Sequence, residues 1–354
     1  MLETATIEIQ KTKQSRLSEL DADNMPFGKH FSDHMFVVDY RDGEWQLPKI
    51  IPYGNMQLSP AMSALHYGQS IFEGMKAHKN SAGDVLLFRP LYNHERFNQS
   101  AERMCMPHIP EKLFMDGLVQ LLQLDSGWVL AKEECSLYIR PVMFATDEFI
   151  GVRESQTYRF VIFTCPVGPY YKNPVKVLIE TKYARAFEGG IGFTKAAANY
   201  GVSLYPTRLA HEKGYQQLIW TEAKEHKYIE ESGVMNVMFV IGDTLITPAL
   251  NNTILPGKTR DSILTIAKDW KMKVEERKVS VEEIIAAFQN GSLKEAFGVG
   301  TAATVAQIIT IGYNGKDYQL PATDDNAFFK RVANHLTDIR KGKAADIHNW
   351  IYKV

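Results

Sequence analysis

One lysine in an unusual segment is the first residue whose surroundings suggest chemistry. Lys195 stands among glycines, alanines and aromatic residues in GGIGFTKAAANYG, and Glu188 is the nearest other charged residue. Burial disfavours the ammonium form, so an amine in apolar surroundings loses its charge readily and can form a Schiff base. The glycines would let the backbone approach a ligand closely. The commoner alternative is a surface lysine whose stem lies on apolar groups.

A carboxylate and a helix-opening turn follow the lysine along the chain. Glu231 lies in YIEESGVMN, between two β-like stretches. A pyridoxal-type cofactor needs a carboxylate beside its pyridine nitrogen, because that charge keeps the nitrogen protonated and makes the ring an electron sink. The segment LPGKTRDS, which begins at Leu255, runs into a helix whose N-terminus is suited to phosphate. Taken singly, these segments also fit an acidic hairpin turn and ordinary helix initiation.

A glycine-rich segment near the C-terminus allows two interpretations. FGVGTAAT, which begins at Phe297, contains the loose dinucleotide fingerprint G-x-G-x-x-A. Too few residues follow Gly298 for the βαβ units of a dinucleotide-binding domain. A Gly-Thr-Ala turn that binds one phosphate fits the same residues. A nicotinamide-dependent oxidoreductase that uses this segment is the alternative from a different class, and bound-cofactor spectra would separate the two.

The composition limits the kinds of partner and the cellular compartment that we expect for the protein. The 354 residues carry a net charge of −1, so no basic excess exists to bind nucleic acid. No apolar run is as long as a membrane span, and the N-terminus lacks the apolar core of a signal peptide. The 3 cysteines include no C-x-x-C pair, which favours a reducing compartment. We expect a cytoplasmic protein without a metal site; a mature form whose leader was removed is the alternative.

The expected elements mix strands and helices without strict βαβ alternation, which favours an α+β architecture. Strand patterns occupy 34–40, 85–89, 136–144, 159–164, 175–180, 217–221, 237–241 and 244–247. Helical patterns occupy 114–124, 259–270, 281–289 and 326–343, and a further helix opens at Pro90. The stretch CPVGPYYKNP, which begins at Cys165, is too rich in proline for a helix or a central strand. We predict a small N-terminal α/β domain at 1–164, a linker at 165–175 and a larger C-terminal domain at 176–354.

Together, these segments resemble fold-type IV enzymes that use pyridoxal 5′-phosphate (PLP). Specifically, the chain is similar to the branched-chain amino acid aminotransferases of the larger subgroup shared by eukaryotes and some bacteria. The resemblance runs from Phe27 to the end of the chain. It includes LHYGQSIFEGMK, LFRP and LYIRP, as well as the Lys195 and Glu231 segments. It implies a two-domain fold with PLP bound between the domains, and a homodimer.

The resemblance implies a role for each cofactor-binding position. Lys195 would carry PLP as a Schiff base and, once freed by substrate, move the proton between Cα and C4′. Tyr200 would hydrogen-bond the phenolic oxygen, and Glu231 would pair with the pyridinium nitrogen. Arg185 would supply a supporting charge. The phosphate would be bound by side chains and backbone N–H groups of Arg89, Thr253, Ile254 and Thr301.

Other positions would form the substrate pocket. Arg140 would receive the γ-carboxylate of glutamate. One subunit would supply the apolar wall from Phe27, Phe72, Tyr138 and Ala302. The second subunit would complete the pocket with Tyr67, Ile150 and Val152.

The implied activity is ping-pong transamination of leucine, isoleucine and valine with 2-oxoglutarate. Within the same fold, the alternatives are a D-amino acid aminotransferase and an aminodeoxychorismate lyase. The long N-terminal part and the YIRP strand argue against both. A non-catalytic protein that keeps the fold is a third class, and the presence of Lys195, Tyr200 and Glu231 together argues against it.

Overall fold

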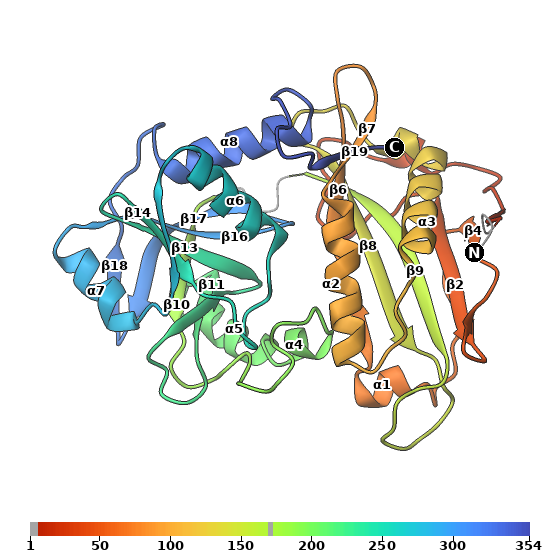
Figure 1. The fold of residues 1–354 in the computed structure, drawn as a ribbon, viewed down its shortest axis with the longest axis horizontal. Helices are drawn as coiled ribbons and strands as arrows, with labels where there is room; N and C mark the ends of the chain where they lie inside the picture. Colours follow the sequence, from red (N-terminus) through yellow and green to blue (C-terminus); the bar gives the residue numbers. More distant parts are fainter. Residues whose placement is uncertain (1–5, 169–172) are drawn as a thin grey trace. The chain divides into compact units, whose positions relative to one another are not determined.

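The structure, a computed structural model, describes residues 6–168 and 173–354 (Figure 1). It divides into two compact units. The first contains Met1–Tyr170, Lys195–Ala197 and Asp338–Val354, and the second contains Tyr171–Thr194 and Ala198–Thr337. Three residues that include the candidate lysine therefore belong to the first unit, although their neighbours along the chain belong to the second. The predicted linker at 165–175 includes residues 169–172, which lie outside the described ranges.

Within the described residues, the first unit contains a ten-stranded sheet with the order β1-β4-β2-β9-β8-β6-β7-β19. Strand β3 pairs with β2, and β5 pairs with β8. The longest ladder joins β8 and β9 in antiparallel register, and the C-terminal β19 pairs with β7. The strands are β1 (Glu8–Ile9), β2 (His34–Arg41), β3 (Glu44–Trp45), β4 (Lys49–Pro52), β5 (Ser70–Phe72), β6 (Met75–Lys79), β7 (Val85–Phe88), β8 (Ser136–Ala145), β9 (Tyr158–Val167) and β19 (Ile351–Lys353).

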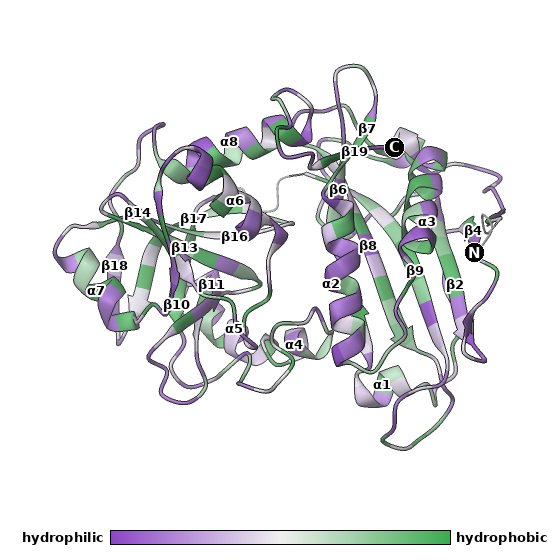
Figure 2. Ribbon diagram, in the orientation of Figure 1, coloured by the Kyte–Doolittle hydropathy of each residue, from purple (hydrophilic) through white to green (hydrophobic). Residues whose placement is uncertain are grey.

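Two helices, α2 (Pro90–Arg103) and α3 (Glu111–Leu124), cover one face of this sheet (Figure 1). The buried rings of Phe97 and Phe160 lie 5.3 Å apart, in an edge-on arrangement. Gly117 of α3 leaves room for the sheet, since a Cβ there would lie 2.7 Å from the Phe36 ring. Strand alternation places the neighbours of these residues on the other face, where Met35 and Val161 belong to a second apolar cluster. In Figure 2, β8 and β9 accordingly contain hydrophobic residues, whereas α2 is partly hydrophilic.

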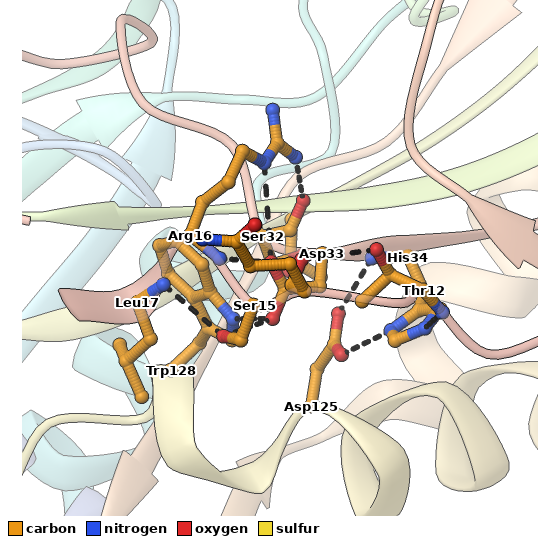
Figure 3. Close-up of polar contacts among 11 residues, drawn as sticks. Thr12, Ser15, Arg16, Leu17, Ser32, Asp33, His34, Asp125 and Trp128 are labelled. Carbon is orange, nitrogen blue, oxygen red and sulfur yellow. Dashed lines mark hydrogen bonds and ion pairs between the residues drawn. The ribbon is translucent and has the colours of Figure 1, made fainter. Parts of the chain in front are cut away.

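The N-terminal segment is fixed to the first unit through Asp33 (Figure 3). This carboxylate accepts hydrogen bonds from the Ser15 hydroxyl at 2.6 Å and the Arg16 N–H at 2.9 Å. The Trp128 indole donates to it at 2.9 Å. Burial alone would raise the pKa of Asp33, but these three donors outweigh it and hold the pKa below its ordinary value.

His34, the next residue, contacts the same segment from β2 (Figure 3). Its Nδ1 lies 2.6 Å from Asp125 Oδ1, and its Nε2 accepts the Thr12 N–H at 2.9 Å. An acceptor role at Nε2 leaves the proton of a neutral ring on Nδ1. The imidazole therefore has a structural role between a carboxylate and the backbone.

The second unit contains, within the described residues, a nine-stranded sheet with the order β12-β11-β10-β17-β16-β13-β14-β15. Strand β12 also pairs with β13, so six strands close into a ring, and β18 pairs with β17. A buried apolar cluster that includes Val177, Phe239 and Ile308 belongs to this unit. The strands are β10 (Val175–Ile179), β11 (Gln217–Thr221), β12 (Ile229–Ser232), β13 (Met235–Ile241), β14 (Thr244–Pro248), β15 (Lys273–Arg277), β16 (Leu293–Gly300), β17 (Thr304–Tyr313) and β18 (Lys316–Gln319).

The remaining helices are short or amphipathic. None in the ranges 6–168 and 173–354 has the length and apolar character needed to cross a membrane. The helices expected at 259–270 and 281–289 are confirmed within one residue. The helices are α1 (Ser63–Tyr67), α4 (Ala198–Gly201), α5 (Leu204–Glu212), α6 (Lys258–Asp269), α7 (Val281–Gln289) and α8 (Phe328–Arg340), with 3₁₀ turns at Leu17–Glu19 and Ser126–Trp128.

The mixed α+β architecture is confirmed, but the strand predicted at 159–164 is longer than expected. The proline-rich stretch was expected to lie outside any helix or central strand, and β9 continues through Cys165 and Pro166 to Val167 as an edge. The ladder between β9 and β2 ends at Phe163, so Pro166 has a strand partner on the β8 side only. A proline is tolerated at such an edge because its missing N–H is not needed by a neighbour.

Candidate functional site

The backbone of the candidate lysine is held against β5 of the first unit. The Lys195 N–H donates to Ser100 Oγ at 3.0 Å, and the Lys195 carbonyl accepts the Phe72 N–H at 3.0 Å. The next two residues pair with Ile71 and Ser70. These bonds fix the start of the lysine side chain on a rigid strand although its flanking segment is irregular.

Aromatic rings and a second cation surround the amine. Lys195 Nζ lies 5.0 Å from the centre of the Phe72 ring, and the Arg140 guanidinium lies 4.5 Å from the same ring. Arg140 Nη2 donates to the Tyr138 hydroxyl at 3.1 Å. The Phe27 ring meets Tyr138 edge-on at 4.9 Å. The first unit thus brings together five residues that the sequence predicted for catalysis and substrate binding.

Arg140 does not use all of its hydrogen-bond donors within the described residues. Its Nε is buried and makes no hydrogen bond with the described residues. The aromatic contacts leave the guanidinium fork available for a planar anion, and a carboxylate fits such a fork. Gly74 makes this arrangement possible, because a Cβ at that position would lie 2.2 Å from the Tyr138 hydroxyl oxygen.

Glu73 is a charged neighbour of the site that the sequence analysis missed. It is fully buried and pairs with Arg96 through two bonds of 2.7 and 2.9 Å. Asn93 and the Gly74 N–H donate to it at 2.6 and 3.0 Å. Burial alone would raise the pKa of Glu73, but Arg96 first and then the charge of Lys195 lower it. Its motif, IFEG, was recognised, but an isolated acid gives no sign of a buried ion pair.

Lys76 was also given no role, although it belongs to the same motif. It lies directly opposite Tyr138 in the antiparallel pair of β6 and β8, and directly opposed residues share a face of the sheet. Burial, and after it the charge of Arg340, lower the pKa of Lys76 to about 7. This side chain therefore titrates near neutral pH beside a residue of the predicted substrate pocket.

In the second unit, Glu231 lies in β12 rather than in the hairpin turn itself. Its side chain is 5% exposed, and its Oε2 lies 3.3 Å from Arg185 Nε. Its Oε1 accepts the Leu255 N–H at 2.7 Å. Asn236, its partner across the hairpin, donates to the Leu255 carbonyl at 2.9 Å. A buried carboxylate and its cross-strand neighbour thus hold the N–H and the carbonyl of one residue, Leu255.

The segment before Leu255 forms a compact turn at 251–254. The Thr253 N–H donates to Asn251 Oδ1 at 2.8 Å, and the Ile254 N–H approaches the Asn251 carbonyl at 3.4 Å. Arg185 donates to the Thr253 carbonyl. Gly192 packs against the same turn, since a Cβ there would lie 2.7 Å from the Thr253 carbonyl oxygen. This glycine permits a close approach of protein backbone to protein backbone.

Arg89 has an unusual backbone at the start of α2. Its φ is 49°, in the left-handed region, and Pro90 follows it. The Arg89 N–H donates to the Trp350 carbonyl at 2.7 Å, and the guanidinium lies 4.8 Å from the Tyr92 ring and 5.2 Å from the Trp350 ring. A non-glycine residue in this region is costly and is often found at functional sites.

The other predicted positions are spread over both units. Tyr200 is half-buried in α4, and Thr301 and Ala302 are half-buried in the turn between β16 and β17. In the first unit, Tyr67, Ile150 and Val152 are 39%, 69% and 90% exposed. The last three are therefore surface residues of the single chain.

The two groups of residues contain the chemical types that PLP requires. The first unit supplies an amine, Lys195, in aromatic surroundings, together with Arg89. The second supplies Glu231, a buried carboxylate suited to a pyridinium nitrogen, and the turn at 251–254, whose Thr253 and Ile254 N–H groups bond Asn251 in this structure. The donor set fits the group.

Comparisons with known proteins identify the family of the chain. The profile of the family described as "Amino-transferase class IV" matches residues 70–311. The chain is 42% identical to branched-chain-amino-acid aminotransferase 2 of Bacillus subtilis (strain 168), over 99% of this chain and 97% of that relative.

Solved structures extend the similarity to the fold. The crystal structure of a branched-chain aminotransferase from Thermoproteus uzoniensis with norvaline has a TM-score of 0.75 and 25% identity, and covers 90% of this chain and 99% of that one. The PLP-form of the enzyme from Thermobaculum terrenum has a TM-score of 0.76 at 20% identity, and covers 92% and 99% of the two chains. The fold-type IV architecture is thereby confirmed.

Proposed function

We propose that this chain, which belongs to the class IV aminotransferases and within them to the branched-chain amino acid aminotransferases, transfers the amino group of leucine, isoleucine or valine to 2-oxoglutarate. The observation that carries the proposal is the cluster of Lys195, Phe72, Arg140 and Tyr138, in which an amine and a partly unsatisfied guanidinium share an aromatic pocket. The names of the relatives support the choice of substrate.

PLP is the proposed cofactor. Lys195 Nζ would hold its aldehyde carbon covalently, Glu231 its pyridine nitrogen and Tyr200 its phenolic oxygen, with Arg185 as the supporting charge. When bound, PLP delocalises the electron pair that remains after the substrate Cα loses its proton. Phosphate binding falls to Arg89, Thr253, Ile254 and Thr301.

Lys195 has a second task once the incoming amino acid has displaced it. Its free Nζ would accept the proton from the substrate Cα, as an amine within reach can do when it acts as a general base. The backbone bonds to Ser100 and Phe72 hold the start of this side chain in place while its amine moves. The two half-reactions share one site, so a ping-pong order follows: the 2-oxo acid of the first substrate leaves before 2-oxoglutarate enters.

The same pocket must accept an apolar side chain and a carboxylate. Phe27, Phe72 and Tyr138 present rings to a branched side chain, with Ala302 as a further wall residue. Arg140 receives the γ-carboxylate of glutamate or 2-oxoglutarate through its planar fork. When leucine is bound, the Tyr138 hydroxyl and the Phe72 ring keep the guanidinium partly satisfied.

We infer that the active form is a homodimer. Tyr67, Ile150 and Val152 are exposed in the single chain, as side chains that contact a partner subunit would be. In the dimer they would complete the substrate pocket of the partner subunit.

An amino-donor panel tests the proposal. Purified protein loaded with PLP is given 2-oxoglutarate and each amino acid in turn, and glutamate formation is measured. Leucine, isoleucine and valine are expected to be the best donors, and Lys195→Ala to abolish transfer while Lys213→Ala, a change at an exposed lysine, leaves it intact. Preference for D-amino acids, or transfer by the Lys195→Ala variant, would contradict the proposal.

A further inference from the structure

Glu230 and Asn251 both lie within hydrogen-bond distance of the Thr253 hydroxyl, and one hydroxyl proton cannot serve both contacts if Glu230 is ionised. Thr253 Oγ1 lies 2.7 Å from Asn251 Oδ1 and is also hydrogen-bonded to Glu230 Oε1. The Asn251 atom must be oxygen, because the Thr253 N–H donates to it at 2.8 Å. A hydroxyl has one proton, so it can donate to Asn251 or to an ionised Glu230, but not to both.

A proton on Glu230 completes the chain of hydrogen bonds. The acid donates to Thr253 Oγ1, and the Thr253 hydroxyl then donates to Asn251 Oδ1, so that each contact has one donor and one acceptor. The other oxygen of Glu230, Oε2, is buried and has no hydrogen-bond partner among the described residues. Such a position is more costly for a carboxylate oxygen, which shares the negative charge, than for an oxygen of a neutral acid.

The charges around Glu230 favour the neutral form. Burial raises the pKa of Glu230, and the charges of Glu231 and Glu222 act in the same direction. The Thr253 hydrogen bond and Arg185 oppose this rise without cancelling it. Arg185 already forms an ion pair with Glu231, so one positive charge would have to serve two carboxylates if both were ionised.

We propose that Glu230 is protonated in the folded protein and positions the turn at 251–254 by donating a hydrogen bond to Thr253. The inference rests on the proposed function in one respect, namely that the turn which contains Thr253 and Ile254 lies at the cofactor phosphate. Glu230 acts through Thr253, so it is a positioning residue and not a catalytic one. Its neutrality also leaves the charge of Glu231 undisturbed for the pyridinium nitrogen.

Infrared spectroscopy of the full-length protein, as the difference between the wild type and Glu230→Gln, tests the protonation state. A protonated carboxylic acid has a carbonyl stretch that is distinct from that of a carboxylate and shifts in D₂O. The wild type is expected to show this band at neutral pH, and Glu230→Gln to lose it. Glu295→Gln is the matched control and should keep the band, because Glu295 is a buried acid that accepts the N–H groups of Phe328 and Phe329 at 2.7 and 2.9 Å, as a carboxylate does. A wild-type spectrum without the band, or a band that survives in Glu230→Gln, overturns the proposal.

Cofactor affinity tests the positioning role. In a spectroscopic PLP titration, Glu230→Gln should bind within about twofold of the wild type, because its amide N–H can still donate to Thr253. Glu230→Ala should bind about tenfold more weakly, the loss expected for one hydrogen bond. The wild type and Glu230→Gln should also share the same pH dependence of affinity near neutrality. Binding by Glu230→Gln that is as weak as that of Glu230→Ala contradicts the role.

The two proposals can fail separately. If PLP does not bind the wild type, the proposed function fails. The infrared band still shows whether Glu230 is protonated, and thermal unfolding still shows whether Glu230 positions the turn. In that case Glu230→Gln should unfold at the wild-type temperature and Glu230→Ala at a lower one. Equal destabilisation by both variants overturns the positioning role without reference to the cofactor.

Discussion

In the proposed function, a single arginine would let one pocket accept two unlike substrates. Arg140 is stacked on Phe72 and bonded to Tyr138, yet its Nε has no partner among the described residues. A charged guanidinium with an unused donor would bind a carboxylate through charge-assisted hydrogen bonds. An apolar side chain would bind by burying its surface against the surrounding rings. The two proposed substrates would therefore depend on different atoms of the same pocket.

We expect Arg140→Met to separate these contributions. The KM for 2-oxoglutarate should rise by on the order of 30-fold, corresponding to about 2 kcal/mol for a charge-assisted hydrogen bond. The KM for leucine should change little, because the methionine side chain preserves the apolar surface. Steady-state kinetics with each substrate measure the effect, with Arg208→Met, at an exposed arginine, as the control. A similar loss for leucine and 2-oxoglutarate would show that Arg140 does not discriminate.

The residues of the site differ in how far the sequence could reveal them. Lys195 was singled out because its neighbours are unusual for a charged residue, and Glu231 because it lies between two β-like stretches and a carboxylate suits a pyridine nitrogen. The pairing of Glu73 with Arg96 joins β5 and β6 to α2, and no spacing in the chain indicates it. The protonation of Glu230 depends on Thr253 and on local burial, and both are set by tertiary structure.

At the scale of elements, strands with alternating or continuous apolar residues were predicted well, and the strand at Gln217–Thr221 is confirmed residue for residue. The hairpin of β16 and β17 was missed because its glycines indicate a turn. In the structure Gly298 lies inside β16, where a Cβ would meet the Met235 side chain at 2.6 Å. A glycine that relieves a close contact and a glycine that makes a turn look the same in a sequence.

Asp33 provides a test of how strongly its hydrogen bonds hold the N-terminal segment against the first unit. The pKa of this carboxyl is lowered in the fold, so its ionised form stabilises the protein above the unfolded pKa of about 3.9, and the stabilisation is lost as the pH falls through the folded pKa. Asp33→Asn should therefore lower the free energy of unfolding by about 1–3 kcal/mol at neutral pH, with a difference that shrinks in acid.

Denaturant unfolding at a series of pH values measures this difference. Limited proteolysis should in parallel show faster cleavage of the segment that contains Ser15 and Arg16. Asp243→Asn, at an exposed turn position, serves as the control and should leave both readouts unchanged. A destabilisation by Asp33→Asn that does not vary with pH would contradict the ionic origin of the effect.

At the scale of the whole molecule, the chain passes from one unit to the other more than once. The residues around Lys195 belong to the first unit, and Glu231 and the turn at 251–254 belong to the second. The residues proposed to hold the cofactor are thus divided between the two units. The proposed dimer adds a further requirement, since Tyr67, Ile150 and Val152 would act in the partner's pocket.

Subunit complementation tests the shared site. Lys195→Ala lacks the amine, and Val152→Arg would place a charge in the partner's apolar pocket, so each homodimer should be nearly inactive. Co-expressed heterodimers should regain about a quarter of the wild-type activity, because statistical mixing gives half heterodimers with one intact site each. Activity no higher than that of the separate variants would show that Val152 does not act across the dimer.

Borohydride reduction followed by peptide mass spectrometry tests the central claim most directly. Wild-type protein loaded with PLP and reduced should carry a phosphopyridoxyl group on Lys195 alone, and the absorbance of the bound cofactor should disappear. The exposed lysine Lys213 in the same protein provides an internal control. Modification at another lysine, or none after reduction of fully loaded protein, would contradict the account.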